Sequence, residues 1–169
     1  MWSAIRGLIE EIKKCQTSGS TTAAIAMAYI CIDTMAFLSL PTGRESQGRG
    51  DFVNWVDMYL KGAPEQPYQY RGIDVYGARC AVLHAFGSDT DFHQQNPDSK
   101  IFGYHDGGMH ALNPNVSERL VIIGTATMLN DVIIAVGTFI EACKADMDIR
   151  TRVESRLPKI LANFPITAE

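Results

Sequence analysis

The residues in this chain best suited to chemistry lie in one short segment, residues 74–84. At 3.6 residues per turn, Tyr76, Cys80 and His84 fall on one stripe of a helix, and Arg79 lies beside Tyr76. His84 comes in the last turn of this predicted helix, where the negative end of the macrodipole favours a charged imidazole. We therefore expect His84 to be a proton donor, with Arg79 and Tyr76 as its neighbours.

The spacing of Arg79 and His84 sets a geometric condition on any joint role. Residues five apart differ by about 140° around a straight α-helix, so their side chains do not converge on one atom unaided. Either the long arginine side chain reaches round the helix, or a second copy of the same helix faces the first. The second arrangement predicts a homodimer.

Two helix motifs carry a resemblance to a known family. The first is Trp-x-x-x-Tyr and the second is Tyr-x-x-Arg-Cys-x-x-x-His; their residues here are Trp55, Tyr59, Tyr76, Arg79, Cys80 and His84. The chain resembles the HEPN superfamily of α-helical bundle proteins, many of which are metal-independent ribonucleases of toxin–antitoxin, phage-defence and RNA-processing systems. It is similar above all to uncharacterised bacterial bundle proteins that pair these two motifs. The likeness covers about residues 3–87.

The resemblance implies a homodimer in which two Arg-x4-His helices line one cleft. His84 would then move the proton of an RNA 2′-hydroxyl or of the leaving 5′-oxygen, and Arg79 would stabilise charge on the phosphoryl group. Tyr76 would support the pair. The resemblance implies an RNA substrate, no metal and no other cofactor, with a 2′,3′-cyclic phosphate and a 5′-hydroxyl as products. It leaves a protein partner of the antitoxin type open.

Two features differ from active members of that family. Cys80 occupies the position after the arginine, where a polar residue is common. The stretch 88–110 carries four aspartates against the single Lys100. RNA binding depends on neutralising phosphates with Lys and Arg. We therefore expect RNA binding here only if the basic C-terminal helix lies alongside.

A structural role is the main alternative for the same residues. Asp33 and Asp131 lie in apolar segments with no local cation, and buried charges need partners. An ion pair between Arg79 and one of these acids would fix the register of the helices without any turnover. The protein would then be a non-catalytic helical scaffold or interaction module.

A small metal-dependent hydrolase is the third alternative, based on His93, His105 and His110 with the nearby aspartates. Their spacing matches no known set of metal ligands, and solvated turn residues are far commoner than such sites. We therefore predict no metal ligands.

Hydrophobic periodicity and helix-stop residues predict one all-α domain over residues 1–169, a bundle of four or more helices with a small β-hairpin insertion. The hairpin is expected at residues 101–110, around Asp106-Gly107. The first two predicted helices cover residues 3–16 and 20–40. The third begins at residue 51 and is ended by Gly62, Pro64 and Pro67, and the fourth runs from residue 74 to a C-terminal Gly87. The fifth covers 113–145 and starts at Asn113-Pro114, and a basic helix runs from Arg150 to near Pro165.

The composition fits one soluble domain: 169 residues, 46% hydrophobic, with a net charge of −4 that gives no overall attraction for nucleic acid. The cysteines are scattered and form no CxxC pair, so we expect reduced thiols rather than disulfides or zinc. The first residues lack the basic-then-apolar order of a signal peptide. Segments 21–40 and 120–140 are apolar, but each carries an aspartate that a bilayer centre disfavours. We therefore expect core helices, no membrane span and a cytoplasmic location.

Overall fold

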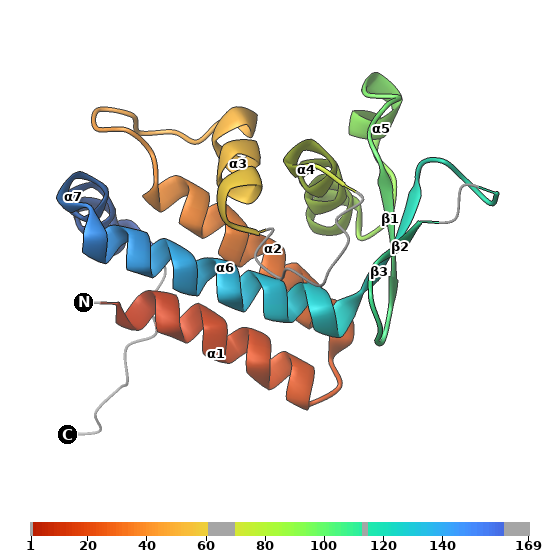
Figure 1. Ribbon diagram of the computed structural model, residues 1–169, viewed down its shortest axis with the longest axis horizontal. Coiled ribbons are helices and arrows are strands. Elements are labelled where there is room, and N and C mark those ends of the chain that lie inside the picture. Colours follow the sequence, from red (N-terminus) through yellow and green to blue (C-terminus); the bar gives the residue numbers. More distant parts are fainter. Residues whose placement is uncertain (1, 61–69, 113–114, 161–169) are drawn as a thin grey trace.

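A computed structural model describes residues 2–60, 70–112 and 115–160, and in these ranges the chain is mostly helical (Figure 1). The α-helices are α1 (Ser3–Thr17), α2 (Thr21–Leu38), α3 (Arg49–Trp55), α4 (Gly72–Cys80), α5 (Asp91–Gln95), α6 (Thr125–Ala145) and α7 (Met147–Arg156). π-Helical turns extend α3 (Val56–Leu60) and α4 (Ala81–Ala85), and a 3₁₀ turn follows α7 (Leu157–Lys159). The strands are β1 (Ile101–His105), β2 (Ala111–Leu112) and β3 (Leu120–Gly124). The prediction of a helical bundle is confirmed.

Helix α2 is the centre of the bundle. It packs against α1, α3 and α6, and α3 in turn packs against α4. In Figure 1, α1 and α6 run along α2, while α3 and α4 lie on its other side. Nine of the eighteen residues of α2 are buried, which is the coverage on several sides that an apolar helix requires.

Helices α2 and α6 are both long and apolar enough to cross a membrane by length and composition. Within the fold, 50% of the apolar window of α2 and 44% of that of α6 is buried. Core helices of soluble proteins satisfy the same criteria.

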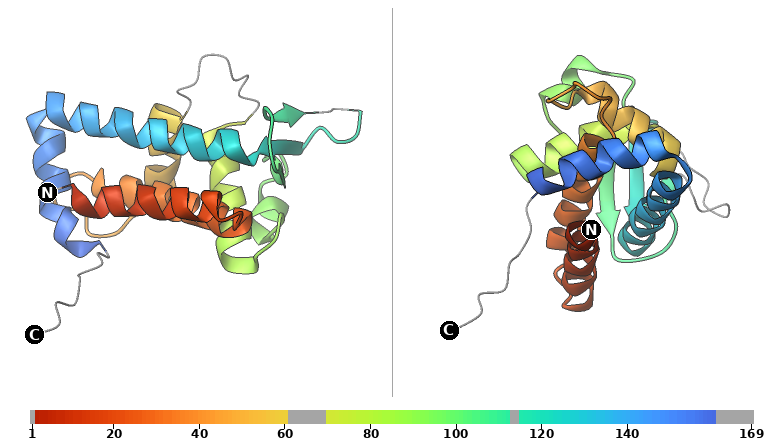
Figure 2. Two further views of the ribbon diagram at one scale, coloured as in Figure 1. Left: turned by 90° about the horizontal axis from the view of Figure 1, so that it is seen from below. Right: turned by 90° about the vertical axis from the view of Figure 1, so that its left-hand side faces the viewer.

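The small sheet differs from the expected hairpin. Strand β1 does not turn back on residues 108–110; it pairs in parallel with β3, with Ile101 opposite Leu120 and His105 opposite Gly124. Strand β2 pairs with the other edge of β3 in antiparallel fashion, giving the order β1-β3-β2. Figure 2 shows the sheet at the end of α6, into which β3 leads directly.

The predicted helix over residues 113–145 is wrong in its first part. Residues 120–124 form β3, and the helix begins at Thr125; Asn113 and Pro114 lie outside the described residues. The run Leu-Val-Ile-Ile is short, continuous and rich in β-branched residues, which is typical of a buried strand as much as of a helix. The strand is the observed form because β3 pairs with a neighbouring strand on each of its edges.

The ends of the other helices follow local chemistry, with two shifts. Helix α4 begins at Gly72, and Asp74 occupies its third position, where the carboxylate accepts the Arg71 backbone N–H at 2.7 Å. At the other end Phe86, not Gly87, takes the left-handed conformation, with φ of 50°. The predicted end points at Gly62, Pro64, Pro67 and Pro165 lie outside the described residues.

Candidate functional site

Arg79 and His84 are in direct contact within one chain. Nη1 of Arg79 lies 2.9 Å from Nε2 of His84. Because α4 continues into the π-helical turn Ala81–Ala85, the geometry links residues five apart rather than four apart. The angular gap expected for a straight helix is therefore closed, and this contact needs no second copy. Such π-helical turns occur mostly as single turns and are frequent at functional sites.

The contact sets the hydrogen-bond roles of the two side chains. A guanidinium group only donates hydrogen bonds, so in this contact Arg79 donates and Nε2 of His84 accepts. A ring nitrogen placed in this way can serve as a base, and the proton donor expected from the helix macrodipole stays a prediction.

Asp33 of α2 holds the same guanidinium from the other side. Its Oδ2 accepts from Nε of Arg79 at 2.7 Å, and its Oδ1 accepts from the Gln47 amide at 3.2 Å. About a fifth of each charged side chain is exposed, 21% for Arg79 and 23% for Asp33. Burial alone would lower the pKa of Arg79, but the hydrogen bond and charge of Asp33 outweigh it and the pKa is raised. The ion pair expected from a structural role is therefore present at Asp33.

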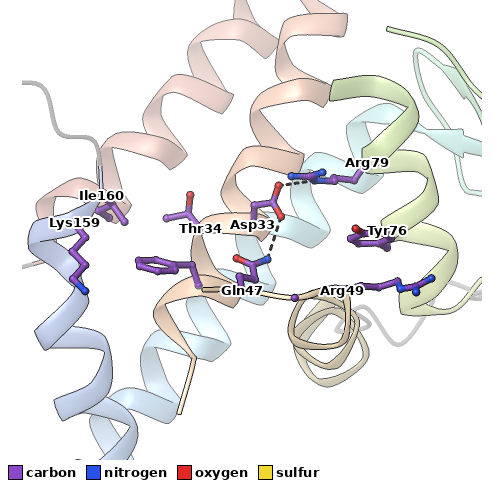
Figure 3. A pocket seen from close by; sticks show the side chains of 10 residues that line it. Asp33, Thr34, Gln47, Arg49, Tyr76, Arg79, Lys159 and Ile160 are labelled. Carbon is purple, nitrogen blue, oxygen red and sulfur yellow. Dashed lines mark hydrogen bonds and ion pairs between the residues drawn. The ribbon is translucent and has the colours of Figure 1, made fainter. Parts of the chain in front are cut away.

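A pocket of about 420 Å³ opens beside this ion pair, between α2, α3, α4 and the 3₁₀ turn that follows α7 (Figure 3). We call it the Arg79 pocket; Asp33, Gln47, Arg49, Tyr76, Arg79 and Lys159 are among the residues that line it. Figure 3 shows Asp33 between Arg79 and Gln47, with Lys159 on the opposite side. Among the described residues, three cationic side chains and one carboxylate therefore line the Arg79 pocket. Asp33 pairs with Arg79, and Lys159 pairs with Glu45 at 2.6 Å. Of the basic C-terminal stretch, Lys159 reaches this pocket, on the side opposite Arg79.

Tyr76 points into the Arg79 pocket from α4, next to Arg79 (Figure 3). Its ring packs edge-on against Phe52 and Phe92, each with ring centres 5.5 Å apart. Burial and the neighbouring Cys80 thiol raise the pKa of the Tyr76 hydroxyl, so the hydroxyl is a hydrogen-bond donor at neutral pH. Arg49 lies over the other aromatic neighbour, Phe92, at 6.0 Å from its ring centre.

His84 itself faces a different hollow from Tyr76. This second hollow measures about 620 Å³, and Cys80, Asp89 and Asp91 are among its lining residues. His84 is exposed. The structure therefore brings Tyr76 and Arg79 into one pocket and joins His84 to them through the guanidinium, at the border with an acidic surface.

The remaining histidines are dispersed. His110 is buried, with Nδ1 accepting the Gly124 N–H at 3.1 Å and Nε2 lying 3.7 Å from Asp131. The second acid in an apolar helix is thus paired with a histidine rather than with Arg79. His93 is buried at the start of α5 and His105 is exposed at the end of β1. In the described ranges no three His, Cys, Asp or Glu side chains gather as a metal site, so no specific observation favours the metal-dependent hydrolase.

Sequence reasoning missed part of the site. Gln47 and Arg49 both lie in the polar, glycine-rich stretch 42–50, which predicts only a loop, and Lys159 is one of several C-terminal basic residues. Their convergence depends on contacts between distant segments. No signal along the chain indicates it.

Comparisons with known proteins identified no relative of this chain. No family model matches the chain, and searches of curated proteins and of solved structures return no match. The geometry of the site and the resemblance to the HEPN superfamily are therefore the two grounds for a function.

Proposed function

We propose that this chain is a HEPN-like, metal-independent endoribonuclease that uses Arg79 and His84 as its reacting pair, with Tyr76 in support. The observation that carries the proposal is the 2.9 Å contact between Arg79, which lines a pocket together with Arg49 and Lys159, and a solvent-exposed His84, which lines the neighbouring hollow. An imidazole with a free path to solvent and an adjacent fixed cation are the two groups that cleavage of a phosphodiester by its own 2′-hydroxyl needs.

The proposed reaction begins with a phosphodiester in the Arg79 pocket. Arg49, Arg79 and Lys159 line this pocket and attract the phosphate, in competition with the carboxylates of Asp33 and Glu45 that pair with Arg79 and Lys159. When the phosphate oxygens take the hydrogen bond that Arg79 gives to His84, Nε2 becomes free to accept a proton. The substrate thus displaces the contact between Arg79 and His84, so that substrate binding frees His84 to act as a base.

The chemical step then follows from these positions. His84 takes the proton of the 2′-hydroxyl, the 2′-oxygen forms a bond to phosphorus, and the bond from phosphorus to the 5′-oxygen breaks. The protonated His84 returns a proton to that 5′-oxygen. Arg79 stabilises the negative charge that builds on the phosphoryl oxygens, and the Tyr76 hydroxyl donates a hydrogen bond to the same group. The products are a 2′,3′-cyclic phosphate and a 5′-hydroxyl.

The assembly belongs to the proposal as well. A cytoplasmic homodimer would place two such pockets along one cleft and double the cationic surface available to RNA. A protein partner of the antitoxin type would act by covering it. What supports the dimer is the exposed apolar surface of α2 and α6, where Ile30 and Ile134 are each 39% exposed.

The test is RNA cleavage in EDTA by the purified protein and by His84→Ala. Loss of general acid–base catalysis costs about 10²- to 10⁴-fold in rate, so His84→Ala should cleave at background level. His105→Ala is the matched control, because His105 is also exposed but lies at the end of β1, outside both hollows. Mass spectrometry of the products should show cyclic phosphate ends.

A second function is favoured by a specific observation, the 2.7 Å ion pair of Arg79 with Asp33. This pair joins α4 to α2 and would hold the two helices in register in a non-catalytic scaffold or interaction module. In that case neither the unmodified protein nor His84→Ala cleaves RNA in EDTA. Equal cleavage by both proteins would mean a contaminant or a different site, and would refute the role of His84.

A further inference from the structure

A second pocket lies on the other side of α3 from the Arg79 pocket. It measures about 260 Å³ and is bordered by the end of α2, by α3 with its π-helical turn, and by α6 and α7. We call it the Trp55 pocket; Leu40, Asn54, Trp55, Tyr59, Phe139 and Arg152 are among its lining residues. Its volume is just below the roughly 300 Å³ at which the usual range for small-molecule sites begins.

Three aromatic rings form its apolar wall. The ring centres of Trp55 and Tyr59 are 5.3 Å apart, those of Tyr59 and Phe139 are 5.4 Å apart, and those of Trp55 and Phe139 are 6.1 Å apart. Mutual edge and tilted packing holds the three rings against one another. The wall is therefore preformed rather than assembled on binding.

Two hydrogen-bond donors at this wall lack acceptors. Trp55 is only 2% exposed, and its Nε1 has no hydrogen-bond partner in the part of the chain that the structure describes. The buried Nε of Arg152 is in the same condition. Buried side-chain donors in folded proteins are nearly always satisfied, by protein, water or ligand. Two orphaned donors at one pocket indicate a missing acceptor.

The charge of Arg152 points the same way. The neighbouring arginines of this helical segment are both satisfied: Arg150 donates to Glu154 at 2.6 Å, and Arg156 donates to the backbone carbonyls of Pro41 and Arg44 at 2.8 and 3.1 Å. Among the described residues, Arg152 has no carboxylate at ion-pair distance. Among the described residues, Arg152 is thus the arginine of α7 whose side chain has neither a carboxylate nor a carbonyl as a hydrogen-bond acceptor.

The acidic residue at the rim does not supply that counter-charge. Asp51 lines the Trp55 pocket, but its Oδ2 already accepts from Arg44 at 2.7 Å and from the Gly48 N–H at 2.8 Å. Arg152 and Tyr59 line the same pocket, and the charge of Arg152 opposes the rise that burial causes in the pKa of the Tyr59 hydroxyl. The pocket thus combines an apolar body with one unmatched positive end.

We propose that the Trp55 pocket binds a small monocarboxylate with an apolar body, its carboxylate on Arg152 and the Trp55 N–H and its body against Phe139. An apolar cleft with a few convergent polar groups is the usual form of a small-molecule site. The carboxylate is the group that satisfies both donors and the charge together. This binding site is independent of the proposed RNA cleavage, which uses the other face of α3.

The experiment is a fluorescence titration with phenylacetate. The chain has two tryptophans, so the variant Trp2→Phe leaves Trp55 as the only indole reporter. Saturable change of Trp55 emission by phenylacetate is expected. The amine 2-phenylethylamine and the neutral phenylacetamide have the same ring without the negative charge, and both should bind at least about tenfold more weakly.

Variants on α7 locate the effect. Arg152→Gln should weaken phenylacetate binding at least about tenfold, while Arg150→Gln, on the same helix and outside the pocket, should leave it unchanged. If Arg152→Gln does not fold, the comparison of the three probes on the Trp2→Phe chain still decides. Absence of saturable binding, equal binding of the amine, or equal loss in the two arginine variants would overturn the proposal. RNA cleavage is assayed separately, so failure of either proposal is distinguishable from failure of the other.

Discussion

The ion pair between Asp33 and Arg79 allows the sharpest test of how this site is held. Asp33→Asn keeps the shape of the side chain but leaves the guanidinium without its counter-charge. Exposed ion pairs contribute about 0.2–1 kcal/mol, whereas breaking a fully buried pair costs about 3–5 kcal/mol. With 21% and 23% of the two side chains exposed, an intermediate loss of about 1–3 kcal/mol in the free energy of unfolding is expected.

The assay is urea unfolding followed by circular dichroism, arranged as a double-mutant cycle. Asp33→Asn, Arg79→Gln and the combined variant are compared with the unmodified chain, and the coupling energy should exceed about 1 kcal/mol, since residues in direct contact couple. In thermal unfolding the same loss corresponds to roughly 2–4 °C per kcal/mol for a chain of this size. Asp98→Asn is the control, because Asp98 is exposed and surface changes stay within about 0.5 kcal/mol.

The outcome bears on function as well as stability. A coupling energy below about 0.5 kcal/mol would refute the view that Asp33 is what holds Arg79 in place. If Asp33→Asn destabilises the fold while RNA cleavage in EDTA persists, the ion pair is structural and the reacting pair still operates. If cleavage is absent in the unmodified chain as well, the pair serves a scaffold.

Three further predictions concern the rest of the molecule. Phe86→Gly should raise the free energy of unfolding by about 0.5–1 kcal/mol. Phe86 has φ of 50° and is 76% exposed, so glycine relieves backbone strain with little loss of buried surface. Phe86→Ala keeps the strain and should therefore give no such gain in urea unfolding. Burial raises the pKa of Cys31 from 9.0 to about 12 and that of Cys143 from 9.0 to about 11. The unfolded chain therefore releases these two protons at a lower pH than the folded chain does, and stability falls as pH rises above 9. The expected loss for the two thiols between pH 8 and 10 is about 2–3 kcal/mol in the free energy of unfolding. The double variant Cys31→Ala and Cys143→Ala should flatten this dependence, and an unchanged slope in urea unfolding would contradict it. Sedimentation at micromolar concentration should show a dimer that Ile30→Asp dissociates, whereas a monomeric unmodified chain would count against the dimer.

How far the sequence predicts the fold depends on the range of the interactions involved. The helices α1 and α2 follow from periodicity and from their stop residues, because apolar spacing and capping act within a few residues. The strand β3 does not follow from local signals, since a short run of β-branched residues fits either a strand or a helix. The strands that pair with β3 lie about 20 and about 10 residues earlier in the chain. The parallel pairing of β1 with β3 joins residues distant in the sequence. The turn signal at Asp106-Gly107 is local and does not indicate this pairing.

The sequence by itself determined that Tyr76, Arg79 and His84 share one helical segment, and that Asp33 and Asp131 each needed a partner. Only the tertiary structure decided how these groups meet: a π-helical turn places His84 on Arg79, α2 brings Asp33 to the same guanidinium, and Asp131 goes to His110 instead. The reason is physical. Residue type and helical spacing are local properties, whereas the choice of counter-charge is made by the packing of α2, α4 and α6, which fixes which buried charges lie within reach of each other.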